Sequence, residues 1–286
     1  MGKNWEELKR RLAEARAVEE ALILFEWDNE TLAPAGAMER TAGTMERLSG
    51  IYFRMMTDPR MGELLETCAG ECSAPEEQAV VREGKKKREE LVKIPREEYE
   101  AFAGLTSRAS LVWAKARKEG DYSLFAPVLK EILAYKKKFP SYKAREGQAL
   151  YDVMLEEFEE GFPTEKLDRF FGQLKEEIVP LLNRIETEGS PVAADFLEGD
   201  YPEEQQAQLG RFLAEYVGFD FHRGVMAVSA HPFTTALHNH DVRLTTHYDR
   251  WVDHSMFSVI HESGHGIYEQ GIADSLTQTP AGEGTS

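Results

Sequence analysis

Two histidines that lie four residues apart, with a glutamate directly after the first, carry the clearest chemical signal in the sequence. The segment reads His261-Glu262-Ser263-Gly264-His265. On a helix, residues four apart share one face, so both imidazoles can reach one metal ion at about 2.0–2.1 Å. The glutamate can take a proton from a metal-bound water, whose pKa zinc lowers to about 7. The spacing therefore predicts zinc ligands at His261 and His265 and a general base and acid at Glu262.

A catalytic zinc ion usually has three protein ligands and a water, so this motif leaves the site one ligand short. The extended metzincin motif would need glycine at 268 and histidine at 271, but the sequence has Tyr268 and Gly271. Glu269 follows the first histidine by roughly 12 Å of helical rise, too far for one ion to bind both. The remaining acidic residues, in a tail rich in Gly, Thr and Pro, are weaker candidates: Asp274 and Glu283.

The histidines of the chain are unevenly distributed along the sequence. None precedes residue 222, and all eight lie between residues 222 and 265: His222, His231, His238, His240, His247, His254, His261 and His265. Surface titration would not need such crowding, whereas a metal site and its polar surroundings use imidazole repeatedly. The crowding favours a metal site, and the alternative is that these are ordinary core or surface histidines.

The elements next to the motif are predicted from the periodicity of the side chains. Between residues 241 and 248, bulky side chains alternate with polar ones, which predicts a β-strand with one polar face. Beyond this strand, apolar residues recur three and four apart, which predicts a helix that carries both motif histidines. Asp253 or Ser255 is expected to cap the start of this helix, and Gly271 its end.

The sequence before residue 218 is predicted to be helical throughout, because apolar residues recur three and four apart with charged residues between them. Proline and glycine interrupt the pattern, and one helix is expected to end near Thr31 and the next to begin near Met38. The predicted fold is mainly α, with a helical region over 1–217 and a strand plus the metal-binding helix over 218–286. Since no interdomain linker is found, 1–286 is expected to be a single, incomplete catalytic domain.

Composition excludes several classes of partner. The formal charge of −17 and the isoelectric point near 5.0 would repel nucleic-acid phosphates and anionic lipids. The sequence has no apolar run approaching the ~18 residues that a membrane span needs and no secretory signal pattern, so a cytoplasmic location is expected. The two cysteines, Cys68 and Cys72, fit neither a disulfide framework nor a CxxC metal pair and are expected to be reduced thiols.

Taken together, the motifs resemble those of the carboxypeptidase Taq family of thermostable zinc carboxypeptidases. Three signatures occur in the family's order: HPF at residues 231–233, DxRxT at residues 241–245 and HExxH at residues 261–265. Further similarity lies in Phe25-Glu-Trp-Asp28, Pro34-Ala-Gly-Ala37, Tyr151-Asp152 and Glu156-Glu-Phe-Glu-Glu-Gly161. The resemblance covers essentially the whole chain.

The resemblance implies a mostly helical fold with a deep central groove and a small sheet beside the HExxH helix. It also implies removal of C-terminal amino acids from peptides, a zinc or cobalt ion, and a homodimer. By position, the two motif histidines would bind the metal and Glu262 would act as general base and acid. His231, Asp241 and Arg243 would border the groove or support the ligands, with Asp241 orienting a ligand imidazole and Arg243 supporting the groove wall.

The chain departs from the family pattern at its end. The family's next motif, a His-Glu-Ser segment that carries the glutamate ligand, should follow shortly after Gly284, and the sequence stops at Ser286. The resemblance therefore implies a truncated chain, roughly the N-terminal half of a full-length member, whose third metal ligand lies beyond Ser286. We expect such a chain to bind zinc weakly and to have little or no activity of its own.

Two other functions stay open. A helical-groove endopeptidase or oligopeptidase would share HExxH, but it would lack the combination of HPF and DxRxT. From a different class, the chain could be a non-catalytic helical module for binding or dimerisation that keeps a vestigial metal helix.

Overall fold

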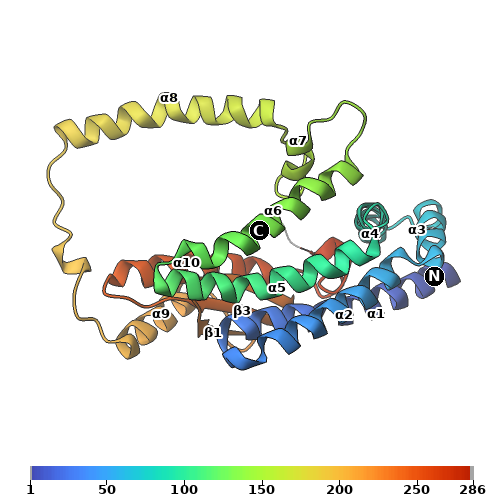
Figure 1. The fold of residues 1–286 in the computed structure, drawn as a ribbon, viewed down its shortest axis with the longest axis horizontal. Coiled ribbons are helices and arrows are strands. Elements are labelled where there is room, and N and C mark those ends of the chain that lie inside the picture. Colours follow the sequence, from blue (N-terminus) through green and yellow to red (C-terminus); the bar gives the residue numbers. More distant parts are fainter. Residues whose placement is uncertain (1, 284–286) are drawn as a thin grey trace. The chain divides into compact units, whose positions relative to one another are not determined.

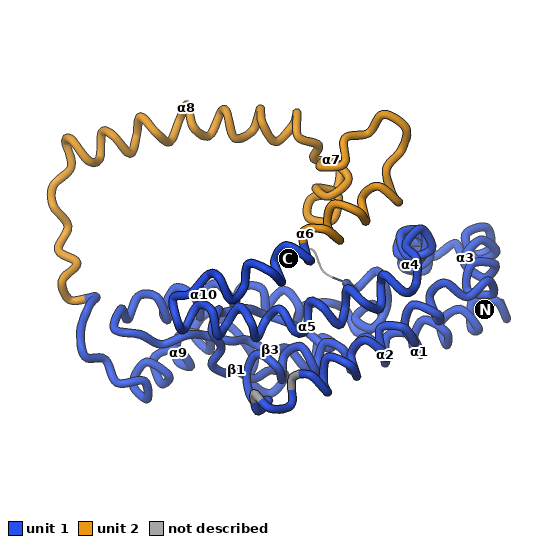
Figure 2. The backbone as a smooth tube through the Cα atoms, in the orientation of Figure 1, with its two compact units in different colours: residues 1–132, 197–286 blue, residues 133–196 orange. Residues whose placement is uncertain are grey.

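The structure is a computed structural model that describes residues 2–283, and of Ala35 and Met38 the backbone only. It divides into two compact units, Met1–Ile132 with Leu197–Ser286 and Leu133–Phe196 (Figure 2). We refer to them as the large unit and the small unit. Whether the chain acts as a single catalytic domain stays a prediction.

Most of the large unit is helical, as predicted. Its helices are α1 (Lys3–Thr31), α2 (Met38–Thr57), α3 (Pro59–Glu71), α4 (Pro75–Leu91), α5 (Arg96–Glu119), the first half of α6 (Tyr122–Lys143), α9 (Glu203–Val217) and α10 (Val252–Gln270), with short 3-10 turns η1 (Ala35–Ala37), η2 (Asp195–Leu197) and η3 (Pro280–Gly282). The predicted end of a helix at Thr31 and start at Met38 are confirmed. No described helix is both long and apolar enough to cross a membrane.

Local sequence sets several of these helix ends. Asp58 caps α3, since its side chain accepts a hydrogen bond from the Arg60 backbone N–H at 2.8 Å, and Pro59 occupies the first turn. Gly218 ends α9 with a φ of 107°, a left-handed conformation that glycine adopts without steric cost. The helical region therefore stops at residue 217, where the periodicity of the sequence changes.

The main hydrophobic core lies among the first four helices. Helices α1, α2 and α5 lie side by side (Figure 1), and α3 packs against both α1 and α4. Leu8, Met56, Met61 and Leu64 are among the fully buried side chains of this core. Its cysteines, Cys68 and Cys72, are free thiols, as predicted, and burial raises the pKa of both, that of Cys72 to about 11.

A three-stranded sheet follows α9. Its order is β1 (Gly224–Val228), β3 (Asp241–Thr246), β2 (Thr234–His238), with β1 parallel and β2 antiparallel to the central β3. The sequence predicted only the central strand, and that strand ends at Thr246, two residues earlier than expected. Helix α10 packs against β3, β2 and α9, so the small sheet does lie beside the helix of the HExxH motif.

The predicted caps of α10 are partly wrong. Trp251 stands at the N-cap position without a capping side chain, and Asp253 and Ser255 lie inside the helix. The Ser255 hydroxyl instead donates to the Gln206 side chain on α9 at 2.9 Å. Gly271 is the C-cap, as predicted.

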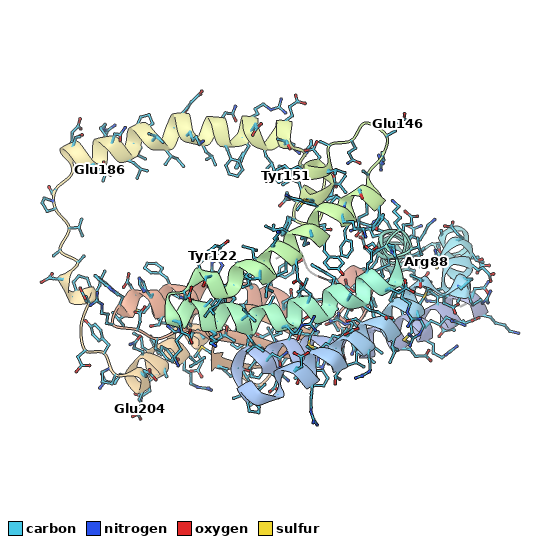
Figure 3. The ribbon with its side chains drawn as sticks, viewed as in Figure 1. Arg88, Tyr122, Glu146, Tyr151, Glu186 and Glu204 are labelled. Carbon is cyan, nitrogen blue, oxygen red and sulfur yellow. The ribbon has the colours of Figure 1, made fainter. Side chains whose placement is uncertain are left out.

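The small unit contains the second half of α6 and the helices α7 (Leu150–Leu155) and α8 (Thr164–Glu188). Thr164 donates through its backbone and its hydroxyl to Asp152, which ties the start of α8 to α7. No residue of α8 is buried, and Figure 3 shows its side chains along the helix, with Glu186 near its end.

A cluster of charges in the large unit joins the segment after α10 to α1 and α4. Lys87 on α4 contacts Glu19 on α1 at 2.8 Å and both carboxylate oxygens of Glu283 at 2.6 and 2.7 Å. Arg16 donates to the second oxygen of Glu19 at 2.8 Å. Burial alone would raise the pKa of Glu19, but Lys87 and Arg16 outweigh burial and lower it. Lys87 therefore favours the ionised form of Glu19, whereas burial still raises the pKa of Glu283 despite its contact with Lys87.

Replacing Lys87 by methionine should destabilise the large unit by about 2–3 kcal/mol at pH 7, a value between those of exposed and buried ion pairs. The loss should shrink as the pH falls toward 4.5. Lys87 stabilises only the ionised form of Glu19. Without Lys87, burial would raise the pKa of Glu19 in the folded state, so protonation of this carboxyl at low pH would stabilise the variant. Urea unfolding followed by circular dichroism at both pH values measures this.

Lys85→Met is the matched control for that experiment. Lys85 lies on the same helix and contacts Glu66 at 2.8 Å, but Glu66 is exposed. Its loss should cost less than about 1 kcal/mol. An equal cost for both variants, or a Lys87→Met cost that does not change with pH, would contradict the role given to Lys87.

Candidate functional site

The two histidines of the motif converge on the exposed face of α10. Their Nε2 atoms lie 3.3 Å apart, and their ring centroids are separated by 4.9 Å. Two nitrogen ligands of a tetrahedral zinc ion, each at about 2.0–2.1 Å, are separated by roughly 3.3–3.4 Å. His261 and His265 therefore fit two neighbouring positions of a tetrahedral metal site.

Glu262 lies on a different face of the same helix and is 7% exposed. The Thr234 hydroxyl on β2 lies 2.5 Å from Glu262 Oε2 and 3.0 Å from the Glu262 carbonyl oxygen. A hydroxyl has one proton to donate, and the shorter contact assigns it to the carboxylate. A buried carboxylate needs such a partner, because burying an unpaired charge is costly.

Thr234 was not singled out by the sequence. It directly follows the HPF segment, but strand β2 is short, and its alternation gave no separate signal. The contact with Glu262 arises from tertiary structure, since β2 pairs with β3 and Thr234 lies opposite Leu244. The feature of the sequence that could have pointed to Thr234 is its position directly after Phe233, the last residue of the HPF segment.

Close packing holds α10 in place. A Cβ atom at Gly266 would lie 2.7 Å from the Phe219 ring and 3.0 Å from Leu244, both of which belong to the buried cluster beneath α10. Such distances leave no room for a methyl group unless these side chains move. Gly210 on α9 likewise lies close to Val259 on α10. Helix α10 is fixed by backbone approach on both the sheet side and the α9 side.

A polar network connects the HPF segment to β3. The Ser229 hydroxyl lies 2.7 Å from the His231 carbonyl and 2.8 Å from Thr245 Oγ1. The backbone N–H of Phe233 also donates to Thr245 Oγ1 at 2.8 Å. Thr245 is fully buried, so the predicted polar face of this strand is partly an internal hydrogen-bonding surface. The network positions His231, which is exposed, beside the metal helix.

Asp241 and Arg243 form a pair with each other. Arg243 donates from Nε to Asp241 Oδ1 at 2.9 Å and from Nη2 to Oδ2 at 2.8 Å. This hydrogen bonding to Asp241 raises the pKa of Arg243. Both carboxylate oxygens of Asp241 thus accept from Arg243, and the expected role of Asp241 in orienting a ligand imidazole stays a prediction. The Arg243 guanidinium lies 4.9 Å from the ring centre of Trp27 on α1.

Two cavities of the large unit border the motif. The larger, of about 560 Å³, is lined by both apolar and polar residues and includes Trp27 and Thr234. The smaller, of about 490 Å³, is lined by His261 and Glu262 and by further polar residues. His231 lines both cavities. The role predicted for His231, in the groove or in support of the ligands, stays a prediction.

The smaller cavity contains a histidine and aspartate pair. His254 Nδ1 lies 2.9 Å from Asp249 Oδ2, and this contact raises the pKa of His254. The ring of His247 contacts the Ser229 carbonyl at 3.1 Å. Part of the histidine crowding in the sequence is thus explained by a polar wall next to the motif.

A third ligand is not supplied by the described residues. Within residues 2–283, no three His, Cys, Asp or Glu side chains gather as a metal site. Glu283 is engaged with Lys87, and Asp274 accepts from the Asn239 side chain at 2.7 Å. The position after Gly284, where the resemblance placed the next motif, lies outside the described residues.

Comparison with known proteins identifies relatives along nearly the whole chain. Residues 7–286 match the family described as "Carboxypeptidase Taq (M32) metallopeptidase". Carboxypeptidase 1 of Bacillus subtilis is 35% identical over 270 residues, which cover 93% of this chain and 54% of the relative. Thermostable carboxypeptidase 1 of Thermus thermophilus is 33% identical, over 92% of this chain and 54% of the relative.

Solved structures show the same fold. The BsuCP crystal structure matches with a TM-score of 0.93 at 33% identity, covering 97% of this chain and 56% of that chain. The M32 carboxypeptidase of Deinococcus radiodurans matches with a TM-score of 0.85 at 30% identity, covering 99% and 57%. The chain thus spans a little over half the length of the relatives that it matches.

Gly266→Ala should destabilise the large unit by about 1–2 kcal/mol, because the clash with Phe219 and Leu244 exceeds the gain in helix propensity. Gly264→Ala is the control on the same helix, since a Cβ atom there meets no other atom within 4 Å. It should be neutral or stabilising by up to about 1 kcal/mol. Urea unfolding of both variants measures the difference, and equal effects would contradict the close approach of α10 to the sheet.

Proposed function

Because the chain belongs to the carboxypeptidase Taq (M32) family of metallopeptidases, we propose that it carries the metal-binding and proton-transfer part of a zinc carboxypeptidase active site. The observation that supports this most directly is the 3.3 Å approach of the His261 and His265 Nε2 atoms, with Glu262 on the same helix. In this proposal the substrates are peptides with a free C-terminal carboxylate. Zinc is the proposed ion, and cobalt is the alternative.

In this proposal each residue of the site has a role that follows from its position. His261 and His265 would hold the ion through their Nε2 atoms. When bound, zinc supplies Lewis acidity and lowers the pKa of a water molecule to about 7. Glu262 would take a proton from that water and return it to the departing amine. Because Thr234 donates to Oε2, the carboxylate is held in one orientation, and Oε1 is left for the proton.

Several properties implied by the family stay predictions. These are the homodimer, the cytoplasmic location, the roles of Asp241 and Arg243, and a third metal ligand. The non-catalytic module is the second candidate function, and the observation that favours it is that the described residues offer only two ligands. Measurements of metal binding and of hydrolysis, taken separately, distinguish the two candidates.

Zinc titration by calorimetry should show one zinc ion per chain. His261→Ala or His265→Ala should weaken binding by at least about 100-fold, since a direct ligand contributes more than an outer partner, whose loss costs about 10–100-fold. His240→Ala is the control, because His240 contacts Asp274 away from the motif. The absence of stoichiometric zinc binding, or an equal effect of all three variants, would favour the non-catalytic module.

Glu262→Gln should keep zinc binding within a few-fold and abolish the residual hydrolysis of the chain, because the amide cannot take up the proton. Release of the terminal residue from a peptide with a free carboxylate, compared with its C-terminally amidated form, measures the reaction. Cleavage of the amidated peptide at the same rate would contradict a carboxypeptidase and favour an endopeptidase. Unchanged hydrolysis by the variant would contradict the role of Glu262.

A further inference from the structure

The larger cavity beside the motif has the size and lining of a ligand pocket. Its volume of about 560 Å³ lies within the ~300–1,000 Å³ typical of small-molecule and cofactor sites. Helices α1, α2, α5 and α6 and strand β2 contribute its walls. Four aromatic side chains line it: Trp27, Trp113, Phe125 and Phe233. Aromatic walls of this kind bind apolar groups by burial of area and by ring contacts.

The cavity lies next to the residue that holds the proposed reacting group. Thr234 lines it, and the hydroxyl of this residue is bonded to Glu262. His231 lines both this cavity and the smaller one, which contains His261 and Glu262. A peptide whose scissile bond lies at Glu262 would therefore place a neighbouring residue at the mouth of the larger cavity.

The wall of the cavity contains a hydrogen-bond donor that lacks a partner. Trp27 is 6% exposed, and its Nε1 atom has no hydrogen-bond acceptor among the described residues. A buried donor left unpaired costs about 1–3 kcal/mol, so a bound ligand that supplies a hydrogen-bond acceptor to this atom would remove that cost. Arg243 lies on the face of the Trp27 ring and is held by Asp241, which fixes the ring in place. A peptide carbonyl is an acceptor of the required kind.

Charge at the cavity restricts its occupant further. Glu26 and Glu30 on α1 line it as well. Burial, and secondarily the charge of Glu19, raise the pKa of Glu26. A second carboxylate brought into this cavity would be repelled by these groups and would lose its hydration. The lining thus disfavours acidic side chains.

From these observations we infer that the larger cavity is a specificity pocket that receives an uncharged aromatic or large aliphatic side chain of a bound peptide, whose backbone carbonyl accepts a hydrogen bond from Trp27 Nε1. The inference rests on the proposed function, because Glu262 defines where the peptide lies. It adds that the site prefers one class of peptide side chain, because residues of α1, α5 and β2 line the cavity that receives this side chain.

The test uses the Glu262→Gln chain, so that binding is measured without turnover. Three tetrapeptides that differ only in carrying Phe, Asp or Lys next to the terminal residue are titrated, and Kd is measured by calorimetry. The Phe peptide should bind at least about 10-fold more tightly than the Asp peptide. Trp27→Phe, which keeps a ring but removes the donor, should weaken binding of the Phe peptide about 3–10-fold, the range expected for one net hydrogen bond.

Trp251→Phe is the matched control, because Trp251 lies at the start of α10 and does not line this cavity. It should leave all three affinities unchanged. Equal binding of the Phe and Asp peptides, or equal effects of the two tryptophan variants, would overturn the pocket. Tightest binding of the Lys peptide would overturn the apolar assignment and show that Glu26 and Glu30 dominate.

The outcomes also separate this inference from the proposed function. If zinc binds at the histidine pair but no peptide binds, the pocket is wrong and the metal centre stands. If the peptides are distinguished as expected but zinc does not bind, the pocket stands and the proposed catalysis is wrong.

Discussion

The close approach of α10 to β3 and α9 is the constraint on which the site depends. Gly266 lies where a single methyl group would collide with Phe219 and Leu244. Because both motif histidines and Glu262 are on this helix, its distance from the sheet sets the position of all three side chains. A small outward shift of α10 would separate Glu262 from Thr234 while leaving the distance between the histidines intact. The helix alone sets the distance between the two histidines, and the packing sets the position of Glu262.

This division follows from helical geometry. Residues four apart share a face, whereas the residue directly after the first histidine is turned by about 100°. His261 is exposed and His265 is half-buried, whereas Glu262 is turned toward the sheet and buried. A carboxylate in that position needs a donor from another element, and Thr234 on β2 provides one. The sheet therefore contributes to the chemistry as well as to the support of the helix.

The sequence was informative where the signal is local. The helical region up to Val217, the strand from Asp241, and the helix that carries the histidines follow from periodicities within one segment. Strands β1 and β2 were missed because each is only five residues long. Each is defined by its pairing with β3, which is parallel for β1 and antiparallel for β2. Thr234 was missed for the same reason, since its partner becomes a neighbour only through that pairing.

Helix α1 links the features that no single segment reveals. Its 29 residues span roughly 43 Å, so it acts as one rigid element along the large unit. Leu8 and Leu12 anchor its first half in the core. In its middle, Arg16 donates to the Leu237 carbonyl on β2 at 2.6 Å, while Glu19 meets Lys87.

Near its C-terminal end, Trp27 forms part of the cavity wall beneath Arg243. Helix α1 thereby contacts residues of the sheet that lie more than 200 positions later in the sequence, and the same sheet holds Glu262. Sites built on such elements are held more accurately than sites built on loops. The first helix therefore helps to set the geometry of the larger cavity, although it carries none of the motif residues.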